Sequence, residues 1–128
     1  MSFLLDTHTL LWFLTDDSAL STKAKAIIES IDSTILVSPA SYWEIAIKIS
    51  LGKYQLPEPL SSFMARELSN NHITILPIDI EHAGRVSELS FHHRDPFDRI
   101  LIAQALIENL PILSVDAVFD LYGVQRIW

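Results

Sequence analysis

The segment Thr34-Ile35-Leu36-Val37-Ser38-Pro39 joins a short β-branched run to a pair of residues that favour a helix start. Threonine, isoleucine and valine are typical of buried strands. Serine is a preferred helix N-cap, and proline is favoured at the first helical position. The segment therefore predicts a strand over 34–37 and a helix that runs from Pro39 to about Leu51 and stops at Gly52.

The same alternation of short apolar runs and longer helical stretches extends along the whole chain. It predicts strands at 3–5, 34–37, 73–76, 111–115 and 124–128. It predicts helices at 7–15, 22–30, 39–51, 60–70, 79–89 and 95–108, and a short one after Asp116. Strands that alternate with helices indicate an α/β fold with a mostly parallel sheet covered on both faces. We expect one domain over residues 1–128, with the strand at 73–76 at the sheet edge.

The composition narrows the possible classes of protein. The 128 residues contain no cysteine, which excludes a disulfide framework, a thiolate zinc site and a cysteine nucleophile. No apolar run is long enough to span a bilayer, and Asp6 comes too early for a signal peptide. We therefore expect a cytoplasmic protein with no membrane contact. The net charge of −7 argues against binding to nucleic acid unless the surplus acids hold divalent ions.

Four acids from separate regions are expected at one edge of the sheet. Asp6 and Asp116 directly follow strands, and Glu44 lies in the helix after the strand at 34–37. Asp98 is in the first turn of the helix before the strand at 111–115, so it lies at the carboxyl end of that strand. Carboxylate oxygens are the ligands that Mg²⁺ and Mn²⁺ prefer. The pattern predicts a site for a hard divalent cation.

Each of these acids also has a purely structural interpretation. Asp6 and Asp116 are able to cap the helices that follow them. Glu44 and Lys48 form an i,i+4 pair, although the helix around them is apolar on nearly every side, which favours a functional role for Glu44. Capping is the better explanation for Asp95, and it explains Asp98 about as well as a functional role does.

Other polar side chains are weaker candidates. Arg94 and Arg99 flank the acids and are candidates to contact phosphate groups, with a solvated charge at the helix start as the alternative. All five histidines are expected in solvent, with His8 and His93 as the best candidates for exceptions. Only three glycines are present, and no phosphate-binding glycine loop occurs.

Four stretches resemble the PIN-domain family, and specifically the VapC-like ribonuclease toxins of bacterial toxin–antitoxin pairs. They cover most of the chain in the order and spacing of the family. The stretches are LLDTHTLLWFL (4–14), SPASYWEIAIKISLGK (38–53), HRDPFDRILIAQA (93–105) and ILSVDAVFDLYGV (112–124).

The resemblance implies a three-layer α/β/α fold with a five-stranded parallel sheet. It also implies RNA cleavage that depends on Mg²⁺ or Mn²⁺, and neutralisation by a small antitoxin protein. Asp6, Glu44 and Asp98 match the invariant acidic positions of the family, and Asp116 matches the fourth. Asp95 belongs to a subgroup variant, and Ser114 stands where threonine is common.

The chemistry of the acids suits this activity, because one or two metal ions activate a water without a protein nucleophile. An arginine of the antitoxin could pair with the acids in place of the ion. Apolar, aromatic-rich helices predict a homodimer. The alternative is a catalytically weak PIN-fold module that binds RNA or a protein partner. A phospho-receiver domain is excluded, because Asp6 stands alone and no lysine follows Lys53.

Overall fold

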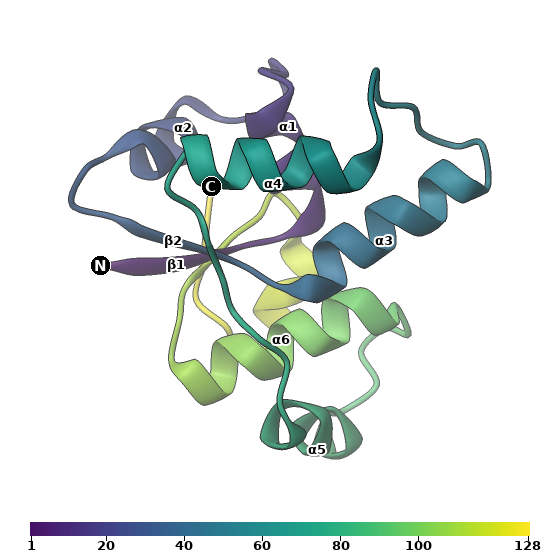
Figure 1. The fold of residues 1–128 in the computed structure, drawn as a ribbon. Coiled ribbons are helices and arrows are strands. Elements are labelled where there is room, and N and C mark those ends of the chain that lie inside the picture. Colours follow the sequence, from purple (N-terminus) through teal and green to yellow (C-terminus); the bar gives the residue numbers. More distant parts are fainter.

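Strands and helices alternate along the chain in the computed structural model, which describes residues 1–128 (Figure 1). The strands are β1 (Ser2–Leu5), β2 (Thr34–Val37), β3 (Thr74–Ile75), β4 (Ile112–Leu113) and β5 (Arg126–Ile127). The helices are α1 (Thr7–Leu14), α2 (Thr22–Glu29), α3 (Pro39–Ser50), α4 (Leu60–Asn70), α5 (Ile80–Glu88), α6 (Pro96–Glu108) and the 3₁₀ helix η1 (Ala117–Tyr122).

The five strands form one sheet in the order β3-β2-β1-β4-β5, and every pair is parallel. The predicted fold class is confirmed, and the sheet is parallel throughout. β3 lies at the edge, as the sequence predicts. β1 is central, with Leu4 paired to Leu36 on one side and to Ile112 on the other. The residue after β1 is therefore held in the middle of the carboxyl edge.

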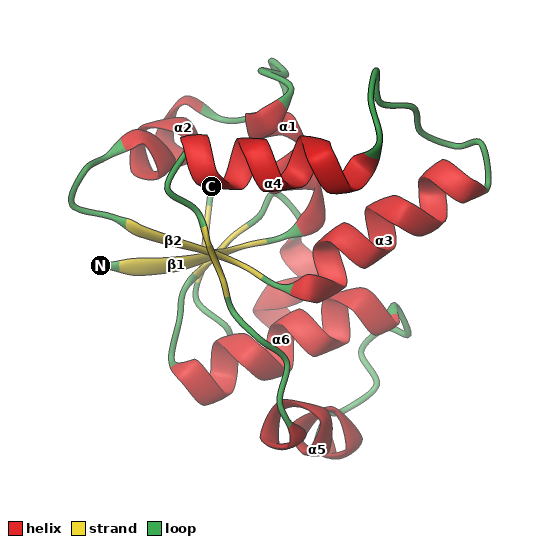
Figure 2. Ribbon diagram, in the orientation of Figure 1, coloured by secondary structure: helices red, strands yellow, loops and turns green.

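Helices cover both faces of the sheet, which gives three layers (Figure 2). One layer contains α1, α2 and α4, the other contains α5 and α6, and α3 contacts both α1 and α6. Alternate side chains of β1 supply the two cores. Phe3 and Leu5 belong to the core beneath α1, α2 and α4, whereas Leu4 packs with Leu101 and Ile102 of α6. No helix is long and apolar enough to cross a membrane.

The helix boundaries follow the local capping chemistry. Ser38 Oγ accepts a hydrogen bond from the Ala40 N–H at 3.1 Å, with Pro39 at the first helical position. Gly52 adopts a φ of +72° just beyond the end of α3, a backbone conformation that favours glycine. Asp79 and His82 form a capping box at the start of α5. His82 is buried, so the expectation that it lies in solvent is wrong.

The last three strands are shorter than the sequence predicts. β3, β4 and β5 have two residues each, because each pairs with its neighbour over only two register positions. After Leu113 the chain leaves the sheet, and two polar side chains, Ser114 and Asp116, fix its course. Ser114 Oγ bonds to the Asp6 carboxylate, and the Asp116 side chain caps η1 through the Val118 N–H. The expected short helix after Asp116 is a 3₁₀ helix.

Candidate active site

Asp6 is a buried carboxylate at the carboxyl end of the central strand. Its Oδ1 accepts from the Thr9 N–H at 2.8 Å, which starts α1, and its Oδ2 accepts from Ser114 Oγ. Thr9 Oγ1 in turn donates to the Leu113 carbonyl at 2.9 Å. Burial raises the pKa of Asp6, against the lowering effect of its hydrogen bonds to Ser114 and Thr9. The capping role and the burial therefore belong to the same residue, and Ser114 acts by holding Asp6.

Asp98 lies in the first turn of α6, close enough to Asp6 for their charges to interact. Burial is the main cause that raises the pKa of Asp98 to about 6, and repulsion from Asp95 adds to it. The Asp6 charge raises the pKa further, whereas a hydrogen bond from His93 lowers it. Asp95 itself caps α6, since its Oδ1 accepts from the Phe97 and Asp98 N–H groups. The structure thus brings two of the four predicted acids, Asp6 and Asp98, within range of each other's charge, with Asp95 near Asp98 as well.

A hydrogen-bonded relay of Tyr122 and His93 supports Asp98 from behind. The Tyr122 hydroxyl oxygen accepts from the His93 N–H and from Arg99 Nη1, each at 3.2 Å. Two acceptors lie within reach of its O–H, namely His93 Nδ1 at 2.7 Å and the His93 carbonyl at 3.4 Å, and the shorter distance favours Nδ1. His93 Nε2 lies 3.1 Å from Asp98 Oδ2, and because an ionised carboxylate only accepts, Nε2 is the donor of this hydrogen bond. His93 therefore presents a donor to the carboxylate and fixes its orientation.

Arg99 is buried, which differs from the expectation that it contacts phosphates or solvent. Its side chain is 4% exposed, and its guanidinium donates to the carbonyls of Val86, Leu89 and Ser90. It also lies 4.2 Å over the Phe91 ring. These bonds tie α6 to the end of α5 and the loop after it, which places Arg99 beneath the relay. Arg94, by contrast, is exposed.

Glu44 and Asp116 each have a separate partner. Glu44 is 3.4 Å from Lys48 in α3, with 13% of its side chain exposed. Asp116 is exposed and caps η1, and its N–H donates to Ser114 Oγ at 3.0 Å. No three histidine, aspartate or glutamate side chains lie close enough together to hold one ion. Convergence of all four predicted acids is therefore not what the structure shows, and ligand roles for Glu44 and Asp116 stay predictions.

The donor set nevertheless suits Mg²⁺ or Mn²⁺. Asp6 and Asp98 offer oxygen donors from two rigid elements, and no cationic side chain forms an ion pair with Asp6. Mg²⁺ usually takes only one or two protein carboxylates and completes its shell with waters and substrate phosphate. Asp6 and Asp98 therefore match the number of carboxylate ligands that such an ion usually takes from a protein.

The sequence pattern had no signal for Tyr122. His93 was identified only as a possible exception among solvated histidines. Tyr122 comes 29 residues later, at the end of η1, and only the packing of η1 against the α6 region joins the two. The tandem of His93 with Asp98 five residues on is the one local sign that the histidine serves an acid.

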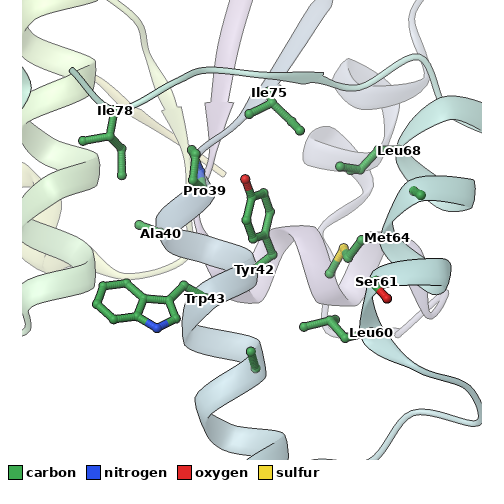
Figure 3. Close-up of a pocket in the computed structure, with 12 residues that line it drawn as sticks. Pro39, Ala40, Tyr42, Trp43, Leu60, Ser61, Met64, Leu68, Ile75 and Ile78 are labelled. Atoms are coloured by element: carbon green, nitrogen blue, oxygen red, sulfur yellow. The ribbon is translucent and has the colours of Figure 1, made fainter.

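Two cavities lie on either side of α3. One, of about 390 Å³, is lined by Glu44, Lys48, Lys53 and the residues 94–97 at the start of α6. The other, of about 660 Å³, lies between α3 and α4, and Figure 3 shows Tyr42 of α3 facing Met64 and Leu68 of α4 across it. Ten of its twelve lining residues are hydrophobic. A polar and an apolar recess thus share one helix.

Comparison with known proteins gives the chain its family. The PIN domain family model matches residues 3–124. Ribonuclease VapC16 of Mycobacterium tuberculosis is 36% identical over 62 residues, which are 48% of this chain and 44% of that protein. The matched region thus spans less than half the length of that curated relative.

Solved structures match the whole fold. The complex VapBC2 of Rickettsia felis, bound to a DNA fragment from its promoter, contains a chain that superposes with a TM-score of 0.74 at 16% identity. The match covers 99% of this chain and 98% of that one. VapBC-1 from nontypeable Haemophilus influenzae matches with a TM-score of 0.65 at 14% identity, over 99% and 97% of the two chains. With the family model matching nearly the whole length, the chain belongs to the PIN domain family.

Proposed function

We propose that the chain is a metal-dependent ribonuclease that hydrolyses RNA phosphodiester bonds, and that it is the toxin of a toxin–antitoxin pair. The observation that carries this proposal is the buried carboxylate of Asp6 with the half-buried carboxylate of Asp98 near it, at the carboxyl edge of the central strand of a PIN domain. Ligand sites of open α/β sheets lie at this edge. The similarity to a protein named as a ribonuclease supports the substrate class.

Asp6 and Asp98 would hold Mg²⁺ or Mn²⁺, with Glu44 and Asp116 as further proposed ligands. A bound ion of this kind supplies an activated water and stabilises the leaving oxygen of a phosphodiester. The chain holds the two carboxylates still for this purpose. Ser114 and Thr9 fix the Asp6 oxygens, and His93 fixes one Asp98 oxygen.

The test is cleavage of a defined RNA by the purified protein with Mg²⁺, with Mn²⁺ and with EDTA. We expect cleavage with either ion and none with EDTA. Asp98→Asn, purified in parallel, detects contaminating nuclease, and Asp32→Asn serves as its control, because Asp32 is an exposed acid outside the site. A folded wild-type protein that binds RNA without cutting it would support the alternative of a catalytically weak module.

The proposed partner is a small antitoxin protein. Structural neighbours of this chain come from VapBC complexes, and the apolar cavity between α3 and α4 is the kind of surface that a protein partner covers. We expect an arginine of the antitoxin to pair with Asp6 and Asp98 in place of the ion. The product of a short neighbouring reading frame should co-purify with the chain and inhibit cleavage. Free cleavage in its presence would contradict this.

We also propose a homodimer in solution. Several large apolar side chains are exposed, including Ile80 at the start of α5, Phe91 before α6 and Leu121 in η1. Closed twofold dimers are the commonest way to cover such surface. Light scattering at micromolar concentration should give twice the chain mass of 14.5 kDa. A monomer mass would contradict the proposal.

A further inference from the structure

Few cations of this acidic chain are free to meet a polyanion. Four of the nine lysines and arginines form ion pairs within 4 Å, namely Lys25, Lys48, Arg66 and Arg126. Arg99 is buried among carbonyl oxygens. The remaining four have no carboxylate within that distance, namely Lys23, Lys53, Arg85 and Arg94. Any electrostatic attraction for phosphate must come mainly from these four.

Two of the four free cations meet in one cavity beside the acids. Lys53 follows α3, Arg94 precedes α6, and both line the cavity of about 390 Å³ whose wall includes Glu44. Asp95, three residues before Asp98, lines it as well. Lys23 and Arg85 line none of the larger cavities of the molecule. The lining therefore holds three cations, Lys48, Lys53 and Arg94, against two carboxylates, Glu44 and Asp95, close to the Asp98 site.

An exposed aromatic pair stands at the same place. Trp43, directly before Glu44 in the sequence, is 62% exposed. Its ring meets Phe97 nearly edge to face, with centroids 5.5 Å apart, and Phe97 lines the cavity that holds Lys53 and Arg94. In Figure 3 Trp43 projects from α3 on the opposite side from Met64 and Leu60. Phe97 thus holds the indole in place while leaving most of it open.

We propose that this surface binds the single-stranded RNA substrate next to the cleavage site. Lys53 and Arg94 contact phosphates of the strand, and one base stacks on Trp43. Cationic grooves with aromatic stacking surfaces are the common means of holding unpaired nucleic acid. A base inside a duplex cannot reach the indole, so the surface selects single strands. This inference rests on the proposed ribonuclease function and adds the three side chains that hold the strand beside the acids.

A protein is a poorer fit to the same surface. An apolar segment would leave Lys53 and Arg94 without partners, whereas the apolar cavity between α3 and α4 has only two non-hydrophobic residues in its lining. Trp43 lies at the border and lines the apolar cavity too. The two cations therefore decide between an RNA and a protein occupant, and Trp43 tests the stacking alone.

The experiment measures the affinity of a labelled 12-nucleotide RNA by fluorescence anisotropy, in EDTA to prevent turnover, over a series of salt concentrations. Lys53→Gln and Arg94→Gln should each weaken binding several-fold and reduce the salt slope by about 0.7 per lost phosphate contact. Lys23→Gln and Arg85→Gln are matched controls, because each removes one free cation elsewhere. Equal losses in the controls would reduce the effect to net charge and overturn the proposal.

The stacking part has its own variants. Trp43→Leu should weaken binding by about five- to a hundredfold without changing the salt slope, and Trp43→Phe should retain most of the affinity. A duplex of the same sequence should bind less tightly than the single strand. Equal binding of duplex, or a Trp43→Leu variant altered only in its light-scattering mass, would overturn the stacking and assign Trp43 to a protein interface.

Cleavage by the wild type with Mg²⁺ is measured separately, so the two proposals can fail independently. In one outcome the wild type cleaves RNA, but the Lys53→Gln and Arg94→Gln variants bind RNA as the controls do. This outcome would reject the proposed RNA-binding surface and keep the ribonuclease function. In the other outcome these two variants lose RNA binding and the controls do not, but the wild type never cleaves RNA. This outcome would reject the ribonuclease function and keep the RNA-binding surface.

Discussion

The two sides of α3 differ in the chemistry of the side chains that they leave without a partner. Towards α6, Asp6 is buried and Asp98 half-buried, and partial burial first, then repulsion from neighbouring acids, raises the pKa of Asp98. Towards α4, a cavity of about 660 Å³ exposes hydrophobic side chains such as Met64 and Ile75. A bound cation would neutralise the carboxylates on the first side, and an apolar partner would cover the hydrophobic side chains on the second. One helix thus separates a region suited to chemistry from a region suited to association.

The largest effect that separates the two regions is expected from Asp98→Asn. Losing a supporting partner of a metal ligand costs about 10–100-fold, and losing the ligand itself should cost more. Cleavage should therefore fall by more than about a hundredfold, while the amide still fits the start of α6. The rate on a defined RNA measures this loss, and circular dichroism checks the fold. Full activity in the folded variant would remove Asp98 from the site.

The second effect concerns the relay behind Asp98. His93→Phe removes the Nε2 donor and should weaken Mn²⁺ binding and cleavage by about tenfold to a hundredfold. Tyr122→Phe keeps the imidazole but loses the hydroxyl that orders its proton, so a smaller loss is expected. Mn²⁺ titration by calorimetry gives the affinity, and the ¹⁵N shifts of His93 report the tautomer. A proton on Nδ1 in the wild type would contradict the relay.

The third effect is on stability and depends on pH. Burial, with repulsion from Asp95, raises the pKa of Asp98 from its ordinary value of 3.8 to about 6 in the folded metal-free chain, so the folded state keeps this proton to a higher pH than the unfolded chain does. The resulting stabilisation is complete below about pH 4 and is lost as the pH rises through about 6. The pKa of Asp6 is raised as well, which acts in the same direction.

Without metal, Asp98→Asn should therefore melt above the wild type at about pH 7.5, and this difference should shrink towards pH 4. Mg²⁺ and protons compete for the carboxylates, so stabilisation of the wild type by Mg²⁺ should grow as the pH rises from about 4 to about 7.5. Thermal melts with and without Mg²⁺ measure both trends. A pH-independent difference between variant and wild type would contradict the shifted pKa.

The smallest effect on cleavage is expected on the other side of α3. Ala65→Glu places a charge at the exposed rim of the apolar cavity, on a helix that tolerates glutamate. It should leave RNA cleavage unchanged and weaken the antitoxin complex, as measured by pull-down and by loss of inhibition. Ser62→Glu, on the same helix but outside the cavity lining, is the control. If Ala65→Glu lowers cleavage and Ser62→Glu does not, the apolar cavity is not independent of the cleavage site.

The sequence predicts most of the fold because its local signals agree with one another. Ser38 with Pro39 and Asp95 with Pro96 mark helix starts where the structure has them. The strand ends are less predictable, since the length of β4 depends on how far its neighbours run alongside it.

The candidate site is predicted only in part. Asp6 and Asp98 meet because the topology brings a strand end and a helix start together. Arg99 was misjudged, because a charge at a helix start usually faces solvent, and the carbonyls that bury it come from α5 and the following loop. The contact of Tyr122 with His93 depends on tertiary packing alone. Side-chain partners that lie far apart in the sequence are what local patterns cannot supply.

The relay also constrains how this chain is able to evolve. Among the seven residues from His93 to Arg99, Asp95 caps a helix, His93 orients the Asp98 carboxylate and Arg99 anchors a loop, while Tyr122 joins this network from a distant segment. A substitution at one member leaves its partners with unmatched donors or acceptors, so single changes there are disfavoured even when the fold survives. Relatives that replace Tyr122 should therefore replace His93 in the same lineage, and insertions should accumulate in the loop between α3 and α4 instead.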